Sequence, residues 1–183
     1  MRRALKALQW MRGPDRWILK SPQHMENLPA LQKVFPDATY VIPHRDPVSV
    51  VTSLITMLSY SARMSRNPVK PHAIADYWVD RVERMLQACV RDIDSLPQEQ
   101  VIHVHFDDFM ANDIETIERI YTMAGHPMTE QVRSGMLQYI KDNPRGKYGR
   151  VRYDIKRDFG LNRDALYERF SFYTNRFNVT LEY

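Results

Sequence analysis

Arg45 and the hydroxyl side chains that follow it are the residues of this sequence best suited to bind an anion. An arginine guanidinium presents parallel N–H donors that match two oxygens of a phosphate. Residues 47–62, directly after this arginine, contain no charged side chain. Within that run, small hydroxyl residues recur at helical spacing, namely Ser49, Thr52, Ser53 and Thr56. Because a solvated helix face normally carries Lys and Glu, we expect this stripe to face packed protein or a bound ligand.

A second interpretation of Arg45 is equally open at this point. Neighbouring elements could bury the uncharged helix on both sides, and Arg45 would then form a salt bridge with a carboxylate. Residue types and spacing do not separate this arrangement from an anion site.

Two local signals predict how Arg45 is positioned. Residues 39–42 are β-branched and aromatic, which is typical of a strand. Asp46 is suited to cap a helix, and Pro47 to occupy its first turn. Residues 101–104 predict another strand, and a long helix from about His72 to Leu96 separates the two. Strands that alternate with helices predict parallel pairing and an α/β fold, in which ligands bind beyond the carboxyl ends of strands.

The rest of the chain predicts mostly helices. We expect residues 2–11 to be helical, residues 17–19 to form a short buried strand, and a helix to run from Gln23 to Val34. Further helical segments are expected at 108–110, 114–124 and 129–141. Residues 143–162 are basic and have no clear period, so they predict a long functional loop.

Composition narrows the class of protein. A chain of 183 residues that is 44% apolar can bury one core, and a single domain over 1–183 is expected. The longest uncharged run is too short and too rich in hydroxyls to span a membrane. The one cysteine, Cys89, lies on the predicted core stripe of the long helix, excludes a disulfide framework and suits the cytoplasm. The six histidines show no metal-ligand pattern, and the net charge of +4 favours anionic partners.

Several motifs together resemble the sulfotransferase superfamily, in particular its bacterial-type branch. The first is Trp17-Ile18-Leu19-Lys20-Ser21-Pro22-Gln23-His24, and the second is His44-Arg45-Asp46-Pro47 with Ser53 eight residues beyond the arginine. The resemblance continues through Val104-His105-Phe106-Asp107-Asp108-Phe109 and reaches Tyr153 and Asp158-Phe159-Gly160-Leu161. It therefore extends over nearly the whole chain, and it implies a parallel sheet flanked by helices, similar to P-loop NTPases.

The resemblance also implies a co-substrate, 3′-phosphoadenosine 5′-phosphosulfate (PAPS). In that family, an arginine and a serine at the positions of Arg45 and Ser53 bind the 3′-phosphate. A basic segment near the C-terminus commonly closes over the same phosphate, and Arg145 and Lys147 are the candidates here. Those two residues could equally belong to a solvated loop or contact an acidic substrate. Phe106 stands where many relatives have a tyrosine beside the adenine, so it could stack on the base or belong to the core.

The catalytic residues implied by the resemblance are Lys20 and His24. Cytosolic relatives have a histidine two residues after the lysine, whereas here it follows four residues later. His24 could deprotonate an acceptor hydroxyl, or it could cap or orient the following helix. Lys20 could place positive charge beside the sulfonate, or it could form an ion pair.

Relatives begin with a strand and a Ser-Gly-Thr-type loop that binds the 5′-phosphosulfate, and no such segment precedes Trp17. We therefore expect a partial domain that lacks this strand and loop, and a sulfonate-transferring enzyme impaired in this chain. The alternative is a non-catalytic binder of nucleotides such as adenosine 3′,5′-bisphosphate. We expect a small-molecule or glycan acceptor and neither nucleic acid nor metal. The sequence does not indicate which acceptor binds or the oligomeric state.

Overall fold

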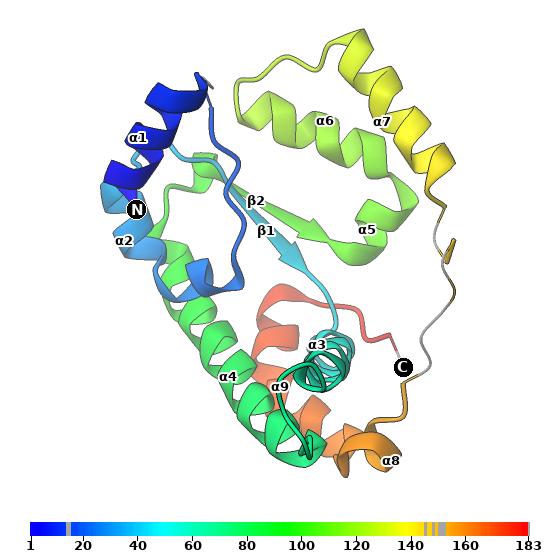
Figure 1. Ribbon diagram of the computed structural model, residues 1–183. Helices are drawn as coiled ribbons and strands as arrows, with labels where there is room; N and C mark the ends of the chain where they lie inside the picture. Colours follow the sequence, from blue (N-terminus) through cyan, green and yellow to red (C-terminus); the bar gives the residue numbers. More distant parts are fainter. Residues whose placement is uncertain (14–15, 145, 148, 150–152, 183) are drawn as a thin grey trace.

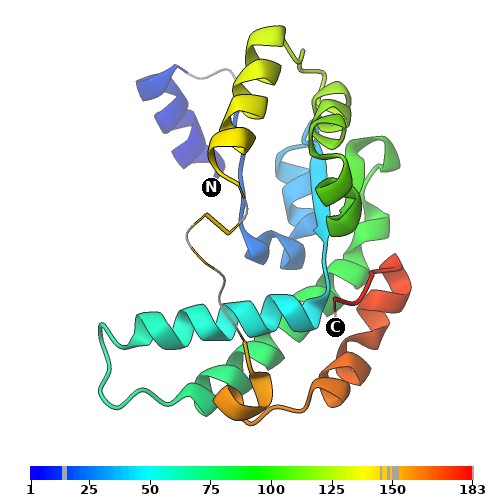
Figure 2. The ribbon, with the colours of Figure 1, turned by 90° about the vertical axis from the view of Figure 1, so that its right-hand side faces the viewer.

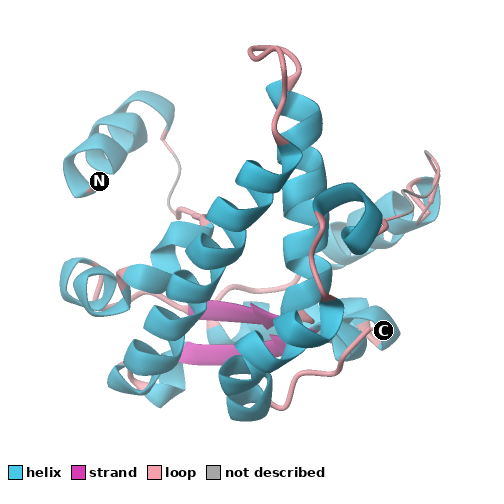
Figure 3. Cartoon of the chain, turned by 90° about the horizontal axis from the view of Figure 1, so that it is seen from below, coloured by secondary structure: helices cyan, strands magenta, loops and turns pink. Residues whose placement is uncertain are grey.

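A short parallel sheet organises the fold. The structure is a computed structural model that describes residues 1–13, 16–144, 146–147, 149 and 153–182 (Figure 1). Within these residues, strand β1 (Tyr40–His44) pairs in parallel with strand β2 (Val101–His105). The register sets Tyr40 opposite Val101 and His44 opposite His105, so both strands end at the same edge. Figure 3 shows the two strands side by side with helices around them. The predicted α/β fold is confirmed, and both strands extend beyond the predicted residues by one or two positions.

The connection between the strands supplies much of the core. Helix α3 (Pro47–Ala62) and helix α4 (Pro71–Asp92) pack against each other, as Figure 2 shows. On α3, Val51 and Ile55 are completely buried, and on α4 Cys89 is 1% exposed. Burial raises the pKa of the Cys89 thiol to about 11, so the thiol stays protonated at neutral pH. Cys89 is therefore a core residue, as the helical stripe predicts.

Two C-terminal helices complete this core, although the sequence pattern predicts neither of them. Helix α8 (Ile155–Phe159) interrupts the expected loop, and helix α9 (Arg163–Phe177) packs against both α3 and α4. Each begins with a residue whose side chain accepts a backbone N–H bond, Asp154 for α8 and Asn162 for α9. Phe170 of α9 has no exposed surface and is the largest fully buried side chain among the described residues.

The N-terminal part differs from the prediction at two places. Helix α1 (Arg2–Arg12) agrees with it. Residues 17–19 form an extended segment outside the sheet, and Ile18 is 91% exposed, so the predicted buried strand is wrong. Aromatic and β-branched residues such as Trp17 and Ile18 favour a strand, but a strand forms only where the backbone pairs with a neighbouring strand. The helix predicted from Gln23 is broken at Asn27 into a 3₁₀ turn, η1 (Pro22–Glu26), and helix α2 (Leu28–Val34).

The remaining elements follow α4 and β2. Helix α6 (Asp113–Met123) packs against both strand β2 and helix α7 (Glu130–Asp142). No helix in the described part of the chain is both long and apolar enough to cross a bilayer. The bounds are η2 (Ile93–Ser95), η3 (Gln98–Gln100), α5 (Phe106–Ala111), α6 (Asp113–Met123) and α7 (Glu130–Asp142).

Candidate functional site

The common edge of the two strands brings Arg45 next to Phe106. Arg45 follows β1 directly, and Phe106 is the first residue after β2. The guanidinium carbon of Arg45 lies 4.1 Å from the centroid of the Phe106 ring. A cation over an aromatic face is attracted by the negative charge of that face. Because the two strands are parallel and end at the same edge, Phe106 contacts Arg45 although the two residues are far apart in the chain.

Asp46 fixes the start of α3 and links it to the C-terminal part of the chain. Its side chain is completely buried, and one oxygen accepts the backbone N–H of Val48 at 2.8 Å, which caps the helix. The other oxygen accepts the hydroxyl of Tyr167 at 3.1 Å and the backbone N–H of Glu182 at 3.0 Å. Burial of a carboxylate without hydrogen-bond donors would reduce the stability of the fold, and these donors offset that cost.

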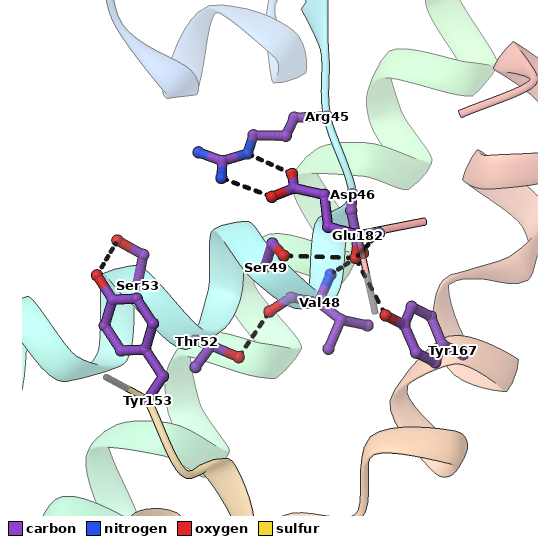
Figure 4. Close-up of polar contacts among 9 residues, drawn as sticks. All are labelled: Arg45, Asp46, Val48, Ser49, Thr52, Ser53, Tyr153, Tyr167 and Glu182. Carbon is purple, nitrogen blue, oxygen red and sulfur yellow. Dashed lines mark hydrogen bonds and ion pairs between the residues drawn. The ribbon is translucent and has the colours of Figure 1, made fainter. Parts of the chain in front are cut away.

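Arg45 forms a bidentate ion pair with Glu182. Its Nε donates to Oε1 at 2.5 Å and its Nη2 donates to Oε2 at 2.8 Å (Figure 4). The Arg45 side chain nevertheless remains 42% exposed, against 25% for Glu182. Arg45 therefore forms a salt bridge with a carboxylate, as in the second interpretation of the sequence. The same fork geometry is the one in which arginine binds phosphate.

The hydroxyl stripe of α3 separates into buried and exposed members. Ser49 and Thr52 are buried, and the Thr52 hydroxyl donates to the carbonyl of Val48 at 2.7 Å. Ser53 is exposed, and its Oγ lies 3.4 Å from the hydroxyl of Tyr153. The stripe therefore faces packed protein on one side, while Ser53 remains open to a ligand.

Arg45 and Ser53 lie close to the N-terminal turns of one helix. In Figure 4, the guanidinium of Arg45 and the hydroxyl of Ser53 lie on the same side of α3. The N-terminus of a helix carries a partial positive charge that favours anions. A small hollow, with room for about one water molecule, adjoins Arg45 at the strand ends, and Ser53 is not part of its lining. It is lined by His44, Arg45, Asp46, His105, Phe106, Asp107, Val179, Thr180 and Glu182.

The other predicted site residues lie in different settings. Lys20 is exposed in the segment before η1, and His24 is half-buried within η1, which packs against α4. The ammonium of Lys147 donates to the carbonyl of Asp142 at 2.8 Å, at the end of α7, where a positive charge is favourable. Arg145 lies outside the described residues. The roles of all four stay predictions.

Beneath the strand ends lies a group of histidines that the sequence did not single out. His44 is 1% exposed, and its ring nitrogens lie 2.7 Å from Nδ1 of His103 and 2.9 Å from the hydroxyl of Tyr173. Burial, together with the neighbouring His103 and His105, lowers the pKa of His44 from 6.5 to about 3. Burial also raises the pKa of Tyr173. His44 is therefore neutral at physiological pH, and it lines the hollow beside Arg45 without adding charge to it.

Comparison with known proteins identifies the family. The family model described as "Sulfotransferase family" matches residues 1–130. The chain belongs to the sulfotransferase family. The crystal structure of sulfotransferase STF9 from Mycobacterium avium superposes on it with a TM-score of 0.84 and 26% identity over 98% of this sulfotransferase chain. Sulfotransferase STF1 from Mycobacterium tuberculosis H37Rv has the same fold, with a TM-score of 0.67 and 23% identity over 85% of the chain. A search of curated protein sequences gave no match.

This sulfotransferase-family chain spans less than half the length of those two structures. It covers 46% of the STF9 chain and 39% of the STF1 chain. The predicted superfamily and its parallel-sheet fold are confirmed by the family match and the first superposition.

Two residues that meet the predicted pair were missed by the sequence reasoning. Tyr153 approaches Ser53 from a segment one hundred positions away, and Glu182 binds Arg45 from 137 positions away. The resemblance to the family reaches Tyr153 but assigned it no role. Glu182 carried no signal, since one acidic residue near the end of a chain is ordinary.

Proposed function

We infer that this sulfotransferase-family protein acts in transfer of a sulfonate group from PAPS to a hydroxyl or amine acceptor. Arg45 and Ser53 bind the 3′-phosphate of the nucleotide in this proposal. The observation that carries it is the exposed Arg45 fork at the end of β1, with Ser53 on the same side of the following helix. Family membership supports the choice of reaction.

The described residues fit a phosphate monoester. The Glu182 carboxylate already engages Arg45 through two oxygens, which is how a phosphate would engage the same donors. The Ser53 hydroxyl can donate a further hydrogen bond, since its contact with the Tyr153 hydroxyl is long at 3.4 Å. The start of α3 adds a favourable electrostatic potential.

PAPS supplies an activated sulfonate whose sulfur–oxygen bond to the 5′-phosphate breaks as the acceptor attacks. The residues of this chain then have four proposed tasks. Phe106 contacts the adenine, and Arg145 and Lys147 come from the segment that closes over the phosphate. Lys20 balances negative charge on the leaving phosphate, and His24 takes the acceptor proton.

Calorimetric titration with adenosine 3′,5′-bisphosphate, the product of the transfer, tests the nucleotide site. Arg45→Gln should weaken binding by roughly tenfold to a hundredfold, because a hydrogen bond to a charged group contributes about 1.5–3 kcal/mol. Ser53→Ala should weaken it by about three- to tenfold. The matched control Arg119→Gln removes an exposed arginine on α6 and should bind as the unchanged protein does.

Failure of the unchanged protein to bind millimolar nucleotide would refute the site. Equal affinities for the unchanged protein and Arg45→Gln would refute the assigned residues. Binding without consumption of PAPS in the presence of acceptors would leave the chain as a non-catalytic nucleotide binder, the second function that the sequence allows.

A further inference from the structure

The C-terminal residues 178–182 run from α9 back to the start of α3. Asn178 ends α9 with a left-handed backbone, at φ 49°, and the N–H of Val179 bonds to the carbonyl of Thr174 at 3.0 Å. Val179 is buried against the core. At the other end of the segment, the N–H of Glu182 bonds to the buried Asp46. The backbone of this segment is thus held at two points, whatever side chain stands at position 182.

The side chain of Glu182 uses the donors that Arg45 would offer to a phosphate. Both Nε and Nη2 of Arg45 point at the two carboxylate oxygens. A guanidinium edge that engages one bidentate anion cannot engage a second in the same way. A phosphate that approaches this edge must displace the Glu182 carboxylate, and a phosphate on the Nη1 side of the same guanidinium lies beside its negative charge, so Glu182 opposes binding in either position.

We propose that Glu182 is an internal competitor of the nucleotide 3′-phosphate for Arg45, and that it determines the affinity and selectivity of the site. This proposal rests on the proposed function, because it presupposes that Arg45 binds that phosphate. In this proposal Glu182 weakens nucleotide binding, whereas Arg45 and Ser53 strengthen it.

Charge explains why such a competitor makes the site selective. A phosphate monoester carries about −1.5 to −2 charges at pH 7, against −1 for a carboxylate, so it can replace Glu182 on Arg45. A nucleotide without a 3′-phosphate has no such group to place there. The ring of Phe106 beneath the guanidinium helps to hold Arg45 in place when the carboxylate leaves. The displaced carboxylate, still tethered beside the phosphate, then favours release of the product.

Titrations of Glu182→Gln test the proposal. Glutamine keeps the length of the side chain but cannot form the ion pair, and the backbone bond to Asp46 is unaffected. Adenosine 3′,5′-bisphosphate should bind about two- to fivefold more tightly to Glu182→Gln, which corresponds to loss of a partly exposed ion pair. Adenosine 5′-monophosphate should bind both proteins equally. The control Glu168→Gln removes an exposed acid on α9 and should change neither affinity.

The outcomes separate this proposal from the proposed function. If the unchanged protein binds adenosine 3′,5′-bisphosphate and Glu182→Gln binds it equally or more weakly, the competitor role is refuted while the nucleotide site stands. A gain that is equally large for adenosine 5′-monophosphate, or for Glu168→Gln, would also refute it, since general charge would then be the cause. If neither protein binds the nucleotide, the nucleotide site itself is refuted, and the competitor role with it.

Discussion

Acidification should destabilise the protein through His44. In the folded chain this histidine is buried with a pKa of about 3, whereas the ordinary value is 6.5. Between these values the unfolded chain binds a proton that the folded chain does not, so the free energy of unfolding falls as the pH falls. The stabilising contribution is complete above pH 6.5 and is lost progressively toward pH 3. At pH 5 the loss from this one group amounts to about 2 kcal/mol.

Urea unfolding followed by circular dichroism at pH 7.5 and pH 5.0 measures this loss. The variant His44→Gln should be less stable than the unchanged protein at pH 7.5, because it disturbs the contacts with His103 and Tyr173. It should nevertheless lose about 2 kcal/mol less on acidification, since glutamine does not titrate. The pKa of His103 is also lowered by burial, which acts in the same direction and remains in both proteins.

The control for this experiment is His126→Gln, which removes an exposed histidine in the turn between α6 and α7. Its loss of stability between the two pH values should match that of the unchanged protein. Should His44→Gln lose as much stability as the other two proteins, the pH dependence does not arise from the buried histidine and the reasoning from burial fails.

Two further substitutions test the packing around the site. Asp46→Ala removes a helix cap and the carboxylate that accepts hydrogen bonds from the Tyr167 hydroxyl and the Glu182 N–H, so unfolding should require about 2–4 kcal/mol less; a loss below about 0.5 kcal/mol in urea would contradict the buried network. Phe170→Ala empties the centre of the core and should cost about 3–5 kcal/mol in the same measurement; a loss below about 1 kcal/mol would show that α9 does not pack as described.

The parts of the fold that depend on local chemistry were predictable from the sequence. Asp46 and Pro47 predict the start of α3 at the residue where the structure has it, because a cap and a first-turn proline act within one helical turn. The two strands were likewise predictable from β-branched residues between helical segments. Arg45 follows from the same local pattern, because a strand end and a helix start lie next to each other in the chain. The choice of Ser53 among the hydroxyl residues of α3 came instead from the resemblance to the family.

Contacts between distant segments were not predictable in this way. Nothing near Arg45 indicates that Glu182 would bind it, since 137 positions separate them and only the packing of α9 brings them together. The strand predicted at 17–19 failed for the same reason: its residue types suit a strand, but pairing depends on a neighbour elsewhere in the chain. Helix α9 was not predicted, because apolar residues occur on several of its faces and obscure the helical period.

Adjacent residues at the end of β1 differ sharply in burial. Side chains of an extended chain alternate between opposite faces, and this alternation continues past the end of the strand. His44 and Asp46 are therefore directed into the protein, where they are 1% and 0% exposed, while Arg45 between them is directed outward. Because its two neighbours are fixed by buried hydrogen bonds, Arg45 starts from a fixed backbone although its own side chain stays accessible. This exposure lets Arg45 pair with Glu182, and it is the property that the proposed phosphate contact also requires, so the proposed competition for this guanidinium would follow from how the strand end is anchored.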